Sequence, residues 1–230
     1  MNPSWFQAID SYCERLGPGF WAEPVNAATN AAFLLAAAHA FLLWRRWRPR
    51  DWPALWLIAV TAVVGIGSFL FHTFANRWSL LADVLPIAVF IYSYFLLAMY
   101  RYLRLGAAAA TAATLAFAVF NLSFPRVWFS LFPGIGLNGS VGYLPALAAL
   151  VAVGIACRIR RAVQPGRALL WGAGAFALSL GFRSIDNAVC PALPLGTHAL
   201  WHVLNALVLW ILMRAALLRA PDRKVPHVPH

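Results

Sequence analysis

The sequence predicts an all-α, polytopic membrane protein built as a bundle of seven transmembrane helices. Of its 230 residues, 62% are hydrophobic and only 11% are charged, whereas soluble domains are nearer half apolar and a quarter charged. Eleven Trp and sixteen Phe suit interfacial belts and lipid-facing packing. The basic residues occur in bursts between apolar stretches. Membrane orientation therefore explains the net charge of +11 better than binding to nucleic acid does.

Seven apolar stretches are predicted to cross the membrane, within one integral-membrane domain over residues 1–230. Residues 1–19 lack a basic start followed by an apolar core, so the first stretch is expected to remain as a helix. Several stretches are shorter than the ~20 residues that a full crossing needs, so flanking residues must extend them. The predicted spans are Asn26–Trp44, Trp52–Phe74, Leu80–Tyr100, Ala107–Phe124, Val141–Cys157, Ala168–Phe182 and Thr197–Met213.

The basic residues divide unequally between the two sides of this topology. By the positive-inside rule, the richer side is cytoplasmic, which places the N-terminus outside and the C-terminus in the cytoplasm. An odd number of spans agrees with this orientation. The richer side carries Arg45, Arg46, Arg48, Arg50, Arg101, Arg104, Arg158, Arg160, Arg161, Arg167, Arg214, Arg219, Arg223 and Lys224, and the other side carries Arg15, Arg77, Arg126 and Arg183.

Five polar residues that are distant in the sequence converge on the outer side. His198 and His202 are four residues apart, as are Ser68 and His72, so each pair projects from one face of its helix. Asp83 begins the third span, eleven residues after His72. Such groups are costly in hydrocarbon and usually mark a functional site. The three histidines are predicted to bind zinc and to leave its fourth position open, as in catalytic zinc sites.

The cysteines are compatible with the same topology. Cys13 and Cys190 both map to the outer side, and Cys157 maps to the inner end of the fifth span. Disulfides persist outside the cytosol, which favours a Cys13–Cys190 bridge and a reduced thiol at Cys157. Two unpaired buried thiols are the alternative.

Three blocks of the chain have a distinctive order and spacing. They are Asp10–Arg15 with Ala22–Asn26, Gly67–His72 with Asp83, and His198–His202. These blocks resemble those of the alkaline ceramidases, of the CREST superfamily of seven-span membrane hydrolases, which also includes adiponectin-type receptors. The resemblance implies an amidase that cleaves ceramide to sphingosine and a fatty acid. It also implies that the three histidines hold zinc with Ser68 and Asp83 beside it, and that Cys13 pairs with Cys190.

The resemblance further implies a calcium site in the acidic loop ahead of the first span. Asp10, Glu14 and Glu23, with Asn26 and backbone carbonyls, are the candidate ligands for the six to eight oxygens that calcium takes. The sequence departs from the family pattern, since Asp10 lies one residue too far upstream and Leu16 replaces an amide ligand. The alternative is helix capping and hydrogen bonding within the loop.

Catalytic roles follow for two residues. Asp83 is predicted to accept a proton from water and pass it to the leaving nitrogen, and Ser68 to donate a hydrogen bond to the developing oxyanion. A Ser68 nucleophile with His72 as its base is the competing mechanism. Structural alternatives also stay open for both residues. Asp83 could pair with Arg77 or cap the third helix after Ser79. Ser68 follows Gly65 and Gly67 and could serve helix packing as a small residue.

The predicted partners are ceramide or a related N-acyl lipid and the bilayer itself. A lipid-regulated receptor or sensor with weak or no hydrolysis is the alternative function, and a transporter is disfavoured because no internal repeat is visible. Alanine-rich helices and seventeen arginines against one lysine favour a bacterium, with the protein in the inner membrane and the site near the periplasm.

Two further features on the outer side are assigned secondary roles. Asp186 is interpreted as a structural residue paired with Arg183. The aromatic segment Val127–Gly139 is predicted to be a loop that covers the substrate entrance.

Overall fold

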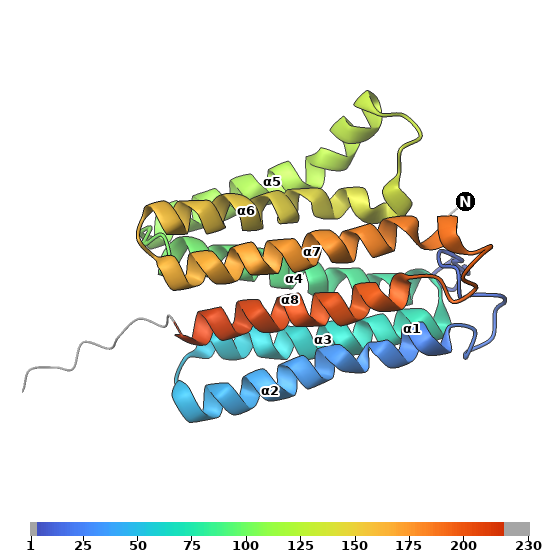
Figure 1. Ribbon diagram of the computed structural model, residues 1–230, viewed down its shortest axis with the longest axis horizontal. Coiled ribbons are helices and arrows are strands. Elements are labelled where there is room, and N and C mark those ends of the chain that lie inside the picture. The colour runs from blue at the N-terminus through green and yellow to red at the C-terminus, as the bar shows by residue number, and fades with distance from the viewer. Residues whose placement is uncertain (1–3, 219–230) are drawn as a thin grey trace, which may run out of the picture.

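The structure, a computed structural model, describes residues 4–218 as an all-helical bundle. Seven helical segments in this range are long and apolar enough to cross a membrane, which confirms the predicted fold class and number of spans. Figure 1 shows them as neighbouring rods of alternating direction. Arg219, Arg223 and Lys224, assigned above to the basic side, lie outside the described residues. The helices are α1 (Pro24–Thr29), α2 (Ala31–Trp47), α3 (Trp52–Phe74), α4 (Arg77–Arg101), α5 (Ala107–Leu131), the 3-10 segment η1 (Leu137–Tyr143), α6 (Leu144–Ile159), α7 (Val163–Val189) and α8 (His198–Leu218).

Most spans are longer than predicted, because polar flanking residues continue the helices. α7 extends the predicted span of residues 168–182 to residues 163–189. Pro125 does not end α5, which continues to Leu131, so the first part of the predicted loop at 127–139 is helical. Proline is tolerated in membrane helices when the surroundings satisfy the freed backbone groups. The last turns of α5 lean away from α6 in Figure 1.

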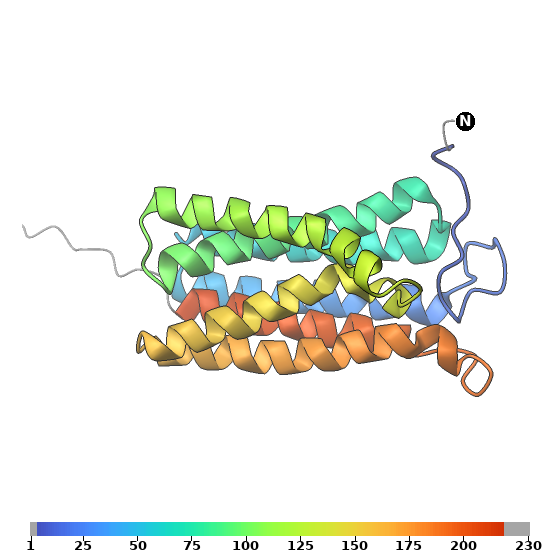
Figure 2. The same cartoon turned by 90° about the horizontal axis from the view of Figure 1, so that it is seen from above.

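α3 and α8 lie at the centre of the bundle. α3 packs against α2, α4 and α8, and α8 also packs along α7. α6 crosses α7 obliquely (Figure 2). α5 is peripheral, since Ala110 is its one fully buried residue. The core therefore lies among the other helices, and α5 is left to face lipid.

The alternation of direction creates two chemically different ends. The site end comprises the N-terminal segment of residues 4–23, the α3–α4 turn, η1 and the α7–α8 loop. The arginine-rich end comprises the α2–α3, α4–α5 and α6–α7 connections and the end of α8. The described members of the larger basic set lie near the arginine-rich end, as the topology predicted.

A tight turn fixes the α3–α4 hairpin at the site end. Ala75 ends α3 in the left-handed conformation, with φ of 42°. Asn76 then begins α4 through a capping box, because its side chain accepts from the Ser79 amide and its own amide donates to the Ser79 hydroxyl. This turn sets how residues near the end of α3 face those near the start of α4.

Candidate metal centre

Three histidines from two helices meet inside the site end. His72 on α3 and His198 and His202 on α8 are fully buried, and a ring nitrogen from each lies within 4.8 Å of the others. Their ring centroids are 4.6 to 5.2 Å apart. The predicted convergence of these histidines is therefore present.

One ring nitrogen of each histidine and one carboxylate oxygen of Asp83 have no hydrogen-bond partner. Nε2 of His72, Nδ1 of His198, Nε2 of His202 and Oδ1 of Asp83 are all buried and unpaired. Buried polar atoms are normally hydrogen-bonded, and leaving one unsatisfied costs about 1–3 kcal/mol. Three imidazole nitrogens within 4.8 Å are a donor set that suits zinc. The residues present therefore fit a metal ion of this type.

Two of the histidines are held from behind through their other ring nitrogen. His72 Nδ1 lies 2.6 Å from Glu23 Oε2, and His202 Nδ1 lies 2.9 Å from the Thr29 hydroxyl. The Thr29 hydroxyl donates to backbone carbonyls of α1, so it accepts from the ring. With the proton on Nδ1, each ring presents an unprotonated Nε2 to the cluster. Partners of this kind orient metal-binding histidines.

Thr29 was not recognised from the sequence, where it is one of several polar residues in the first span, with Asn26, Asn30 and His39. Glu23 was predicted, but as a calcium ligand. Burial alone would raise the pKa of the Glu23 carboxyl, but the hydrogen bonds from His72 and Arg15 and the charge of Arg15 outweigh burial and lower it. Glu23 is therefore held as a carboxylate.

Asp186 fixes the start of α8, where the second histidine lies. Its fully buried carboxylate accepts from the backbone amides of Thr197 at 2.6 Å, His198 at 2.9 Å and Cys13 at 3.0 Å. Gly196 precedes these residues with φ of 64°, and a Cβ there would overlap the Asp186 carboxylate. Asp186 thus ties α7, α8 and the N-terminal segment together, where pairing with an arginine was predicted.

Tyr12 covers the outer face of His198. The two rings stack with centroids 3.6 Å apart and planes 17° apart. The Tyr12 hydroxyl accepts from Nη1 of Arg183 at 2.6 Å. Burial raises the pKa of the Tyr12 phenol to about 12, so the ring remains neutral. Sequence spacing gave no signal for this stack.

The predicted Cys13–Cys190 disulfide is present, with Cα atoms 5.6 Å apart. It joins the N-terminal segment to the end of α7, directly beside the backbone amide that Asp186 binds. Cys157 is buried in the core and lies outside the disulfide. The bridge and Asp186 together hold the N-terminal segment over the metal centre.

Ser68 and Asp83 are brought together by a close approach of α3 to α4. A Cβ on Gly67 would overlap the backbone carbonyl of Ala82, so only glycine allows this helix spacing. Ser68 and Asp83 follow these two residues, interact with each other and line the same cavity as His202. The packing role of Gly67 and the polar role of Ser68 are thus both compatible with the structure.

The acidic loop residues do not form an open calcium site. Both Glu14 oxygens accept from backbone amides at the start of α1, at 2.7 and 2.8 Å. Glu23 accepts from Arg15 and from the Asn26 side chain, and Asp10 is exposed. Within residues 4–218, the histidines are the group of metal-binding side chains that gathers. These contacts agree with the alternative interpretation, capping and hydrogen bonding, and do not fit calcium.

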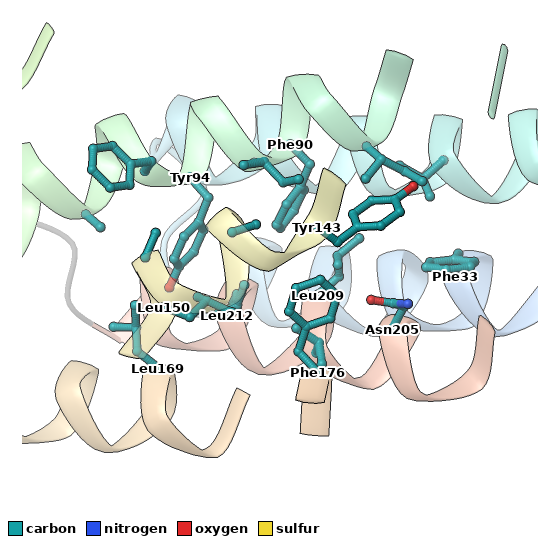
Figure 3. Close-up of a pocket in the computed structure, with 18 of the residues that line it drawn as sticks. Phe33, Phe90, Tyr94, Tyr143, Leu150, Leu169, Phe176, Asn205, Leu209 and Leu212 are labelled. Carbon is teal, nitrogen blue, oxygen red and sulfur yellow. The ribbon is translucent and has the colours of Figure 1, made fainter. Parts of the chain in front are cut away.

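An apolar cavity extends from His202, Ser68 and Asp83 into the bundle (Figure 3). Along α8 its lining runs from Trp201 to Leu212, which is about 16 Å of helix. Tyr94 and Leu169 lie toward its far end in Figure 3. The walls are aromatic and aliphatic, and include Phe33, Phe90, Tyr143, Phe176 and Leu209. In polarity, these walls match a hydrocarbon chain.

Comparison with known families supports the same chemistry. A sequence model of the Ceramidase family matches residues 12–226, which include the histidine cluster, Ser68, Asp83 and both disulfide cysteines. A comparison with curated proteins finds no match. Because the matched region covers nearly the whole chain, this protein belongs to the Ceramidase family.

Proposed function

We propose that this protein is a zinc-dependent intramembrane amidase that hydrolyses the N-acyl bond of ceramide, or of a closely related N-acyl lipid. The observation that carries the proposal is the set of unpaired, buried histidine nitrogens beside Asp83, at the end of an apolar cavity. Family membership supports an amide-bond hydrolase. The products would be a sphingoid base and a fatty acid.

His72, His198 and His202 would hold the zinc ion through their unpaired nitrogens. Glu23 and Thr29 would orient two of the rings from behind. Bound there, zinc would supply the Lewis acidity that polarises an amide carbonyl and acidifies water.

Two side chains would then move protons and stabilise charge. Asp83 would take the proton from the water that attacks the amide carbon, and would deliver it to the nitrogen as the C–N bond breaks. Ser68 would donate a hydrogen bond to the carbonyl oxygen as that oxygen becomes negative. Both residues lie at the cavity wall next to His202, which supports these roles.

The lipid's acyl chain would occupy the apolar cavity. Burial of apolar surface stabilises the bound chain by roughly 25 cal/mol per Å². The chain would place its carboxyl end beside the histidines and its methyl end toward Tyr94. The substrate could then enter from the bilayer without crossing water.

We also propose the membrane orientation. Charge bias supports a cytoplasmic arginine-rich end, and therefore a metal centre near the outer side. In a bacterial inner membrane this outer side would be the periplasmic one. Residues 1–230 would form one integral-membrane domain.

The test is hydrolysis of ceramide by purified protein in detergent, with the fatty acid and sphingosine measured by mass spectrometry and bound zinc quantified. We expect turnover that is lost after chelation and restored by zinc. Asp83→Asn should keep zinc and lose roughly 10²- to 10⁴-fold in rate.

The other outcomes separate the alternatives. One equivalent of zinc without turnover of any N-acyl lipid would favour the receptor or sensor function. An acyl group on Ser68 would support the serine mechanism. Protein that binds no zinc would refute the proposal.

A further inference from the structure

Arg15 places a buried positive charge between the acidic loop and the metal centre. Its side chain is 4% exposed. Nε donates to Glu23 Oε1 at 2.5 Å, Nη1 to the carbonyl of Gly17 at 3.0 Å and Nη2 to the carbonyl of His72 at 3.0 Å. One guanidinium therefore has a carboxylate and two backbone carbonyls around it.

Carboxylates and backbone carbonyls are also the ligands that calcium prefers. Glu23 is among the residues that the family resemblance assigns to calcium, and here Arg15 already neutralises it. A divalent ion at the same oxygens would lie in contact with the guanidinium, where like charges repel strongly. Glu14 is engaged by helix amides and Asp10 is exposed, so neither offsets that repulsion.

We propose that Arg15 is a built-in cation that takes the place of calcium, and that it acts as a positioning residue for His72. Glu23 links Arg15 to Nδ1 of the His72 ring, while Arg15 itself binds the His72 backbone carbonyl. Both the ring and the main chain of His72 are thus held by one ion pair. The positioning role rests on the proposed metal centre, whereas the absence of a calcium requirement does not.

The experiment measures metal binding rather than turnover. Protein stripped of metal and reloaded with zinc is dialysed against radioactive calcium up to about 1 mM, the weak end of protein calcium sites. We expect wild type to bind no calcium, with unchanged zinc content and melting temperature. Saturable binding of calcium near one equivalent by wild type would overturn the proposal.

Arg15→Ala tests the positioning role. We expect its zinc affinity to fall about 10- to 100-fold, and guanidinium or calcium ions to restore part of that loss by entering the vacated position. Arg77→Ala, at the same end but outside this cluster, should change neither property. Unchanged zinc affinity in Arg15→Ala would refute the positioning role.

Arg15→Lys covers the case in which Arg15→Ala does not fold. Lysine keeps the charge but loses the planar fork that reaches three acceptors. We expect Arg15→Lys to exclude calcium and to bind zinc more weakly than wild type; calcium binding by this variant would count against the proposal. Failure of ceramide hydrolysis alone would leave all of these binding results intact, so the two proposals fail separately.

Discussion

The two ends of the bundle both bury charged and polar side chains, but they differ in how far those side chains find hydrogen-bond partners. At the arginine-rich end, Arg101 donates two hydrogen bonds to Asp51, at 2.8 and 2.9 Å, and a third to the Ala216 carbonyl. Asp51 also caps α3 through the Ala54 amide. At the site end, three histidine nitrogens and one oxygen of Asp83 are left unpaired, as are the side-chain oxygens of Asn26 and Asn30 and Nε of Arg183.

Under the proposed function, this difference separates residues that stabilise the fold from residues that would bind the metal ion and substrate. A paired buried ion costs several kcal/mol to break, because its partner is left uncompensated. An unpaired buried atom already costs free energy in the folded state. Its removal should therefore cost ligand binding and little stability.

The largest effect on activity is expected from substitution of an unpaired histidine at the site end. His198→Ala should abolish stoichiometric zinc binding and lower ceramide hydrolysis on the order of 10³-fold or more, since the metal contributes several kcal/mol to the barrier. The melting temperature of the metal-free protein should stay the same or rise, because a buried unpaired nitrogen is removed. Fatty-acid release, bound zinc and thermal unfolding are measured together.

His39→Ala is the matched control, since His39 Nδ1 accepts from Trp210 at 2.8 Å outside the cluster. It should keep zinc and activity. A destabilised His198→Ala protein that still binds zinc would contradict the separation of the two ends.

The next largest effect, a loss of folding stability, is expected from substitution of the buried ion pair at the arginine-rich end. Asp51→Ala should lower the free energy of unfolding by about 3–5 kcal/mol, because Arg101 is left buried without its partner. The folded fraction should keep its zinc and its rate per molecule. Removal of both partners, in Asp51→Ala with Arg101→Met, should be closer to neutral. Loss of activity at unchanged stability would show that this pair serves the reaction instead.

Substitution of Asp186 should have an effect of intermediate size, because Asp186 lies at the site end but both of its carboxylate oxygens accept hydrogen bonds. Asp186→Asn replaces one acceptor oxygen with a donor, which opposes either the Thr197 and His198 amides, bound by Oδ1, or the Cys13 amide, bound by Oδ2. We expect zinc affinity to fall roughly 10- to 100-fold as His198 loses its fixed position. A zinc competition assay measures the change, with the exposed Asp10→Asn as control. Equal affinities in the two variants would refute a positioning role for Asp186.

How much of the fold and of the site could be predicted from the sequence depends on how far apart in the chain the interacting residues lie. The seven spans follow from hydropathy, and the shared end of His72 and His198 follows from counting crossings. The faces within one helix follow from its period, which pairs His198 with His202. The span ends were too short because polar flanks remain helical, as in α7.

The supporting contacts could not be predicted in the same way. Thr29 and His202 are 173 residues apart, as are Cys13 and Asp186. Such pairs depend on helix rotation and side-chain packing, which no local period specifies. The use of Glu23 was likewise hidden, because only the fold shows that Arg15 reaches it.

The smallest effect, a change in acyl-chain preference, is expected from substitution of Tyr94 at the far end of the cavity. Tyr94 lines the cavity, and its hydroxyl forms a hydrogen bond with that of Tyr102 at 3.1 Å. Tyr94→Leu removes volume at the far end of the cavity, so longer acyl chains should be favoured by roughly tenfold or less in kcat/KM. Tyr100→Leu, an exposed tyrosine on the same helix, should leave the preference unchanged. If both variants change the kcat/KM ratio of long to short acyl chains equally, the acyl chain does not lie along this cavity. If only Tyr94→Leu changes it, residues toward the arginine-rich end determine which acyl chain lengths are accepted for cleavage at the site end.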